Sequence, residues 1–162
     1  MSAIFDEIAP FAAALPPAGP LMGLDPGTKG IGIAFSDGRR AIATPDRTLR
    51  RRKFSADAAV LLEAVASRGA AGIVLGLPRN MDGSEGPRAQ SSRAFARNLS
   101  GLMALPILMW DERLSTVAAE RALLEADASR KRRGQVIDSV AAGLILQGAL
   151  DRLAHLKRET AG

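Results

Sequence analysis

The chain of 162 residues contains no cysteine, so disulfide bonds and metal sites built from thiolates are excluded. Its one histidine, His155, gives little basis for catalysis by imidazole. No apolar run approaches the ~20 residues that a membrane span requires. The N-terminus carries Asp6 and Glu7 where a secretion signal would carry positive charge. We therefore expect a cytoplasmic protein with no membrane partner.

Aromatic residues are also scarce, at 4%, although hydrophobic residues of all kinds make up 47% of the chain. The core is therefore expected to consist mainly of Leu, Ile, Val and Ala, and the length suits one domain. Lys and Arg number 22 against 17 Asp and Glu, which gives a net charge of +5. An excess of positive charge favours polyanionic partners, above all nucleic acid, although it also serves solubility.

The apolar pattern divides the chain into a domain at residues 21–156 between two tails. Residues 1–20, rich in Ala and Pro, are expected to form a tail or a short docked segment, and residues 157–162 a C-terminal tail. Strands are predicted at 21–25, 30–36 and 41–49, with a tight turn at Asp37-Gly38. Further strands are predicted at 72–77 and 106–110, and helices at 54–68, 87–101, 115–126 and 135–156. Ser55 is expected to cap the first of these helices.

This order predicts an α/β fold with a mixed five-stranded sheet. The first three strands would form an antiparallel meander, and right-handed crossovers would place the later strands parallel to the first. Helices would cover both faces of the sheet, which is the ribonuclease H-like arrangement. In such sheets ligands gather at the carboxyl ends of the parallel strands.

Two acidic residues follow predicted strands. Asp25 ends the first strand and opens a glycine-rich turn, where an Asp can also serve only to accept backbone hydrogen bonds. Asp111 and Glu112 follow the strand at 106–110, and alternation places them on opposite faces. We expect Glu112 to face the site, although an acidic residue also stabilises a helix that begins just after it.

A third acidic residue, Asp138, lies inside an otherwise apolar helix. Its neighbours on the same helical face include Ala141, Ala142 and Ile145, so its carboxylate is expected to point inward, unless it caps a helix that begins later. A buried carboxylate is costly unless it is paired or binds a metal. Oxygen ligands suit Mg²⁺, so Asp25, Glu112 and Asp138 are predicted to be both catalytic residues and ligands of a two-metal site.

Basic and polar residues near these positions are candidates for binding substrate. Thr28 and Lys29 lie in the turn after Asp25, and two basic runs occupy 50–53 and 130–133. Lys and Arg bind phosphates, although a basic run can also be solvated surface. The full predicted set for substrate binding is Thr28, Lys29, Arg79, Asn80, Arg113, Arg132 and Arg133.

Four segments together resemble the YqgF family of bacterial ribonuclease H-like proteins, described as nucleases of pre-16S rRNA and earlier as Holliday junction resolvases. The segments begin at Asp25-Pro-Gly-Thr-Lys, Gly76-Leu-Pro-Arg-Asn, Asp111-Glu-Arg-Leu-Ser and Val136-Ile-Asp-Ser-Val, and the resemblance covers residues 21–151. It implies Mg²⁺ or Mn²⁺ dependence, acidic metal ligands at Asp25, Glu112 and Asp138, and maturation of the 5′ end of 16S rRNA. Pro26 and Gly30 depart from the family, which often has a bulky apolar residue and Arg there.

The sequence therefore predicts a metal-dependent endonuclease acting on structured RNA. One alternative is a Holliday junction resolvase acting on four-way DNA, which would need two symmetric active sites and so a dimer; the sequence leaves the oligomeric state open. Another is a nucleic-acid-binding factor without catalysis, which would not need three carboxylates. ATP-using enzymes of the sugar kinase class share the Asp25 motif, but they need two such domains, for which 162 residues are too few.

Overall fold

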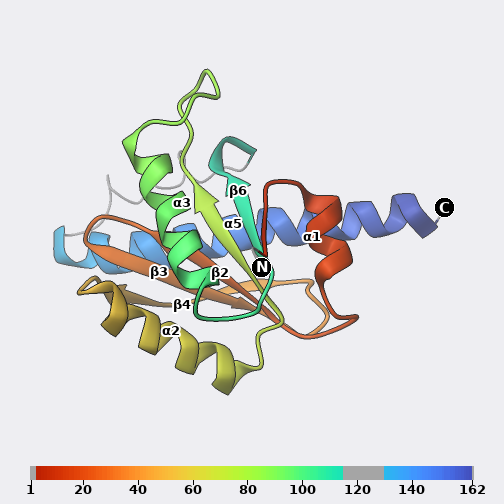
Figure 1. Ribbon diagram of the computed structural model, residues 1–162, viewed down its shortest axis with the longest axis horizontal. Coiled ribbons are helices and arrows are strands. Elements are labelled where there is room, and N and C mark those ends of the chain that lie inside the picture. The colour runs from red at the N-terminus through yellow and green to blue at the C-terminus, as the bar shows by residue number, and fades with distance from the viewer. Residues whose placement is uncertain (1–2, 115–129, 162) are drawn as a thin grey trace.

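One six-stranded sheet, in the order β1-β6-β5-β2-β3-β4, organises the chain (Figure 1). The structure is a computed structural model that describes residues 3–114 and 130–161, and for 130–136 it describes the backbone alone. The strands are β1 (Ile4–Phe5), β2 (Leu21–Pro26), β3 (Gly30–Ser36), β4 (Ala43–Arg50), β5 (Gly72–Leu77) and β6 (Ile107–Asp111). The helices are α1 (Ile8–Ala14), α2 (Phe54–Arg68), α3 (Pro87–Ser100), the 3₁₀ turn η1 (Glu112–Leu114) and α5 (Arg130–Ala161).

The directions of the strands agree with the prediction. β2, β3 and β4 form an antiparallel meander, whereas β5 pairs in parallel with both β2 and β6. The carboxyl ends of β2, β5 and β6 therefore meet at one edge of the sheet. The helix predicted at 115–126 lies outside the described residues.

Both ends of the chain differ from the prediction of two tails. β1 pairs in parallel with β6, with Ile4 opposite Ile107, so the sheet has six strands and not five. α1 follows it and buries Phe11 completely among apolar side chains of α5 and β6. The side chain of Phe11 is removed from water only when α1 docks, so the hydrophobic effect favours packing of the N-terminal segment onto the domain. At the other end α5 continues to Ala161, so residues 157–161 extend the helix.

Helices cover the two faces of the sheet in separate layers (Figure 1). α2 and α3 cover one face, where Leu24, Ile31, Leu75 and Phe95 belong to one apolar cluster. α5, about 48 Å long at 1.5 Å per residue, and α1 cover the other face, which we call the α5 face. None of the helices in the described ranges is long and apolar enough to cross a membrane.

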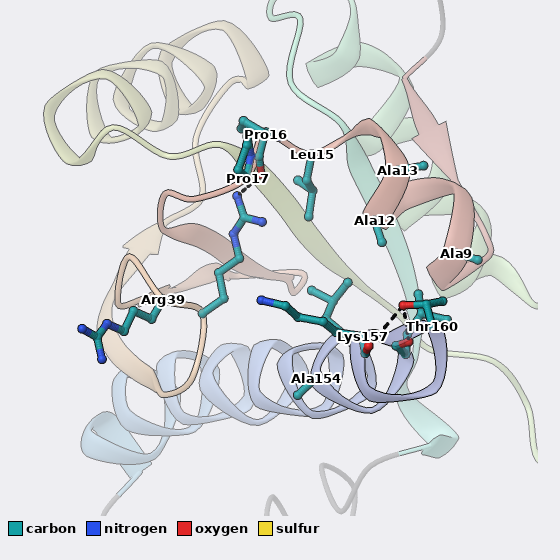
Figure 2. A pocket seen from close by; sticks show the side chains of 13 residues that line it. Ala9, Ala12, Ala13, Leu15, Pro16, Pro17, Arg39, Ala154, Lys157 and Thr160 are labelled. Atoms are coloured by element: carbon teal, nitrogen blue, oxygen red, sulfur yellow. Dashed lines mark hydrogen bonds between the residues drawn. The ribbon is translucent and has the colours of Figure 1, made fainter. Parts of the chain in front are cut away.

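An apolar groove of about 560 Å³ lies between α1, the C-terminal part of α5 and the β3–β4 turn (Figure 2). Arg40 shapes its wall by donating hydrogen bonds to the carbonyl oxygens of Gly19 and Pro16, at 2.8 and 2.9 Å. These residues precede the start of β2, so the groove lies at the end of the sheet opposite Asp25. The predicted site residues do not line it.

Candidate active site

Asp25 lies near the end of β2 and is 4% exposed. Two residues earlier, Gly23 faces α5 so closely that a Cβ there would lie 2.7 Å from the Cβ of Leu146. Side chains alternate along a strand, so Asp25 faces α5 as well. On β3 its cross-strand partner is Gly32, which has no side chain to cover it.

Asp138 reaches the same place from α5. A Cβ at Gly30 would lie 2.9 Å from its Oδ2, and a Cβ at Gly27 would lie 3.8 Å from its Oδ1. The carboxylate of Asp138 therefore lies against the glycines of the β2–β3 turn, facing the sheet. Any larger side chain at Gly30 would compete with it for this space.

Glu112 lies in η1, directly after β6. Its Cδ is 3.6 Å from the position of a Cβ at Gly76, a residue of β5 that itself faces Ile145 of α5. Leu75 pairs with Leu24, so Gly76 is level with Asp25 on the neighbouring strand. The structure thus places all three carboxylates on the α5 face, around the carboxyl ends of β2, β5 and β6.

The donor chemistry of this trio fits a hard divalent cation, because all three groups offer carboxylate oxygens. Within the part of the chain that the structure describes, no group of three or more Asp, Glu, His or Cys side chains is close enough together to hold a metal ion. Ligation by Asp25, Glu112 and Asp138 together would therefore require their side chains to turn toward one another. The glycines at 27, 30 and 76 leave no side chains of their own in the way of such a movement.

The turn after Asp25 is held by its own backbone and by Arg51. The amide of Gly27 donates to the carbonyl oxygen of Gly30 at 2.9 Å, and the Arg51 guanidinium donates to the Gly27 carbonyl at 2.7 Å. The same guanidinium lies 5.4 Å from the centre of the Phe95 ring. Thr28 and Lys29 are exposed at the tip of this turn. Arg51 thus has a structural role that its place in a basic run does not reveal.

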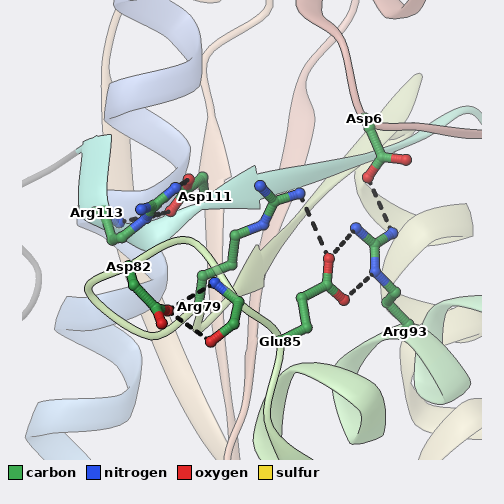
Figure 3. A network of polar contacts seen from close by, with 8 residues as sticks. Asp6, Arg79, Asp82, Glu85, Arg93, Asp111 and Arg113 are labelled. Carbon is green, nitrogen blue, oxygen red and sulfur yellow. Dashed lines mark hydrogen bonds and ion pairs between the residues drawn. The ribbon is translucent and has the colours of Figure 1, made fainter.

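On the other side of the site, a network of ion pairs links the loop after β5 to α3 and to Asp6, the residue after β1 (Figure 3). Arg93 donates to both carboxylate oxygens of Glu85, at 2.6 and 2.8 Å, and lies 2.9 Å from Asp6. Arg79 lies 3.5 Å from Glu85. The hydrogen bond from Arg93 lowers the pKa of Glu85, with the charges of Arg93 and Arg79 adding to the effect.

Two predicted substrate contacts are therefore already engaged by carboxylates. Arg79 faces Glu85, and Arg113 lies 2.7 Å from Asp111, whose pKa its hydrogen bonds lower. Asp111 itself points away from the α5 face, as the alternation of side chains predicts. Asn80 fastens the loop, because its Nδ2 donates to the Ser84 hydroxyl at 3.0 Å.

Arg132 and Arg133, with the rest of the run at 130–133, belong to the first turns of α5. Their side chains lie outside the described residues.

The order and directions of the strands, with helices on both faces of the sheet, define the class, a ribonuclease H-like fold. A solved structure described as RuvC of T. thermophilus in complex with Holliday junction substrate matches it with a TM-score of 0.51. The match covers 85% of this chain and 96% of that one at 11% identity, which bears on the fold alone.

The chain belongs to the RuvX family, whose model, described as a Holliday junction resolvase, matches residues 19–152. Over 148 residues it is 72% identical to a protein of Rhodobacter capsulatus, covering 91% of this chain and 93% of that one. Over 155 residues it is 66% identical to a protein of Paracoccus denitrificans, covering 96% and 98%. Both relatives bear the name "Putative pre-16S rRNA nuclease". The family resemblance and the fold class drawn from the sequence are confirmed.

Proposed function

We propose that this protein is a metal-dependent endonuclease that hydrolyses a phosphodiester bond at the 5′ end of pre-16S rRNA. One observation carries the proposal: three carboxylates from β2, η1 and α5 lie around the same strand ends, with Asp138 against the glycines that follow Asp25. The names of the close relatives support RNA as the substrate. Such an activity belongs to ribosome biogenesis in the cytoplasm.

Asp25, Glu112 and Asp138 would hold Mg²⁺ or Mn²⁺, which when bound supplies activated water and stabilises the charge on the leaving oxygen. Asp25 is buried on a central strand, so it gives the site a fixed point. Glu112 and Asp138 approach it from a 3₁₀ turn and a helix, and each can turn about its own side-chain bonds. The strand would thus fix the position of the Asp25 carboxylate, while the side chains of Glu112 and Asp138 would rotate to complete the metal site.

The β2–β3 turn is suited to orienting the substrate. Thr28 offers a hydroxyl and Lys29 an ammonium group, both exposed, and the glycines of the turn allow the nucleic-acid backbone to come close. These groups would bind phosphate oxygens at and next to the scissile bond and so hold the strand in line with the carboxylates.

Arg79, Asn80, Arg113, Arg132 and Arg133 complete the proposed contacts. A phosphate would have to compete with Glu85 for Arg79 and with Asp111 for Arg113. We therefore assign these two a smaller share of the affinity than an unpaired cation would have.

The second candidate is a Holliday junction resolvase, which the description of the RuvX family favours. Purified protein incubated with Mg²⁺ or Mn²⁺, with precursor 16S rRNA and a four-way DNA junction in parallel reactions, separates the two. Cleavage of the RNA at its 5′ end supports the proposal. Symmetric cleavage of the junction, with intact RNA, would replace it with the resolvase.

A further inference from the structure

The cations around the candidate site fall into two groups. Arg79, Arg93 and Arg113 on one side are each paired with a carboxylate. On the other side, the side chains of Lys29 and Arg50 have neither an ion pair nor a hydrogen bond to any part of the chain that the structure describes. As far as the described residues go, the site thus has one flank whose arginines are paired and one flank whose cations have no carboxylate partner.

The basic run at 50–53 is not uniform. Arg51 holds the β2–β3 turn and packs over Phe95. Arg52 lies 3.7 Å from the buried carboxylate of Asp57, whose oxygens also accept from the Arg52 amide. Only Arg50 and Lys53 are left without such a role within the described residues, and Arg50 is the one that belongs to the sheet.

Register places Arg50 on the face that carries the carboxylates. It pairs with Gly30 at the end of the β3–β4 ladder, and residues directly opposite each other point to the same face. Gly30 faces Asp138 Oδ2, whereas the neighbouring Leu49 packs against the core of the other face. Cross-strand Cβ atoms lie about 5 Å apart. The Cβ of Arg50 therefore lies about 5 Å from the position of a Cβ at Gly30, which is next to the Asp138 carboxylate.

Lys29 stands at the same corner. It immediately precedes Gly30, and its carbonyl oxygen accepts a hydrogen bond from the Arg51 amide at 2.9 Å. This main-chain hydrogen bond keeps the segments that carry Lys29 and Arg50 next to each other. β4 is at the edge of the sheet, so a long polyanion can approach this corner from outside.

We propose that Lys29 and Arg50 form a phosphate-binding subsite beside the carboxylates. The main path by which the nucleic-acid strand leaves the site then runs across the β2–β3 turn and the β4 edge, while the paired Arg79 in the loop at 78–86 contributes the smaller share of the affinity. This inference rests on the proposed nuclease function. Its physical basis is that a free guanidinium binds a phosphate and releases counterions, while a paired one must first give up a carboxylate.

The first test measures binding without cleavage, in EDTA. Fluorescence anisotropy follows the affinity for a 5′ fragment of precursor 16S rRNA and for a four-way DNA junction over a range of salt concentrations. Arg50→Gln should reduce the slope of log affinity against log salt by about 0.7 for a single-stranded contact, or about 0.9 for a duplex contact. Lys29→Gln should do the same, and Arg50→Lys should restore the slope.

Arg39→Gln is the matched control, since Arg39 is also an exposed arginine of the β3–β4 hairpin but lies at the opposite end of the sheet. It should leave the slope unchanged. Equal slopes for Arg50→Gln and Arg39→Gln would overturn the subsite while leaving the nuclease proposal intact. Wild-type protein that binds neither nucleic acid would overturn both.

The second test determines the path of the strand. Because the chain has no cysteine, Arg50→Cys, Asp82→Cys and Arg39→Cys can each carry a single tethered iron–EDTA group that cuts nearby nucleic acid. We expect cuts from position 50, on one side of the scissile phosphate, and none from 39. Cuts from position 82 with none from 50 would show that the strand crosses the 78–86 loop instead.

Discussion

The main-chain carbonyl of Asp138 lies directly against Gly32. The Cβ of any larger residue at position 32 would overlap that carbonyl group and lie only 3.0 Å from the amide nitrogen of Ser139. The contact fixes the distance between α5 and β3 at the level of the carboxylates. A glycine with an ordinary strand conformation thus sets the position of a proposed metal ligand.

Gly32→Ala should therefore force α5 away from the sheet. We expect a loss of about 1–3 kcal/mol in the free energy of unfolding, the usual cost of overpacking, together with a loss of cleavage as Asp138 is displaced. Urea denaturation measures the first effect. Gly38→Ala is the control, because a Cβ there meets nothing within 4 Å, and its stability should stay within about 0.5 kcal/mol of wild type. Similar stability for both variants would show that the contact imposes no constraint.

Asp138→Asn should separate catalysis from folding. The amide has the shape of the carboxylate but is a poor metal ligand, and it relieves repulsion among three acidic groups on one face. Cleavage should be abolished, while unfolding without metal should show equal or slightly greater stability. Glu112→Gln should behave in the same way. If Asp138→Asn instead unfolds the protein, the role of the side chain is structural.

Metal binding should stabilise the fold through the same carboxylates. In the presence of Mn²⁺ at a hundred times its dissociation constant, the free energy of unfolding should rise by about 2.7 kcal/mol, and EDTA should remove the gain. Asp25→Asn should lose this response. Asp151→Asn, an exposed change on the same helix as Asp138, should keep it. A full response from Asp25→Asn would exclude Asp25 as a ligand.

Acid should weaken the ion-pair network beside the site. The pKa of Glu85 is held below its ordinary value by Arg93. The contribution of this carboxylate to the free energy of unfolding is therefore fully present above about pH 4.3, the pKa of a free Glu. That contribution is lost as the pH falls through the lowered pKa in the folded state. Glu85→Gln should lower the free energy of unfolding by about 1 kcal/mol at pH 7. It should also make the decrease of that free energy between about pH 5 and 2 less steep, as measured by denaturation at each pH. Glu63→Gln, exposed on α2, should leave both unchanged.

The elements with strong local signals could be predicted from the sequence. β5 was predicted with its observed bounds because the run Gly72–Leu77 has no polar side chain and ends at Pro78. The β3–β4 turn was predicted from Asp37-Gly38. β1 was missed because two residues carry no periodic pattern, and their pairing depends on β6, about a hundred positions away.

Side-chain partners were harder to foresee. The prediction that Ser55 caps α2 is wrong: the N-cap is Lys53, and the buried Asp57 carboxylate accepts from the Arg52 amide at 3.0 Å. Arg79 was predicted as a free phosphate contact, yet Glu85 lies beside it because the loop folds back. The structure ends β6 at Asp111 and places Glu112 in η1, so the choice of Glu112 over Asp111 by alternation along the strand stays a prediction.

The most direct test of the proposed function compares wild-type protein with Asp25→Asn on precursor 16S rRNA in Mn²⁺ or Mg²⁺. Asp151→Asn serves as the control for the loss of one negative charge. The proposal predicts cleavage at the 5′ end by wild type and Asp151→Asn, and a rate at least about 100-fold lower for Asp25→Asn, since even outer-shell changes at metal sites cost up to that much. Equal cleavage by wild type and Asp25→Asn would contradict it.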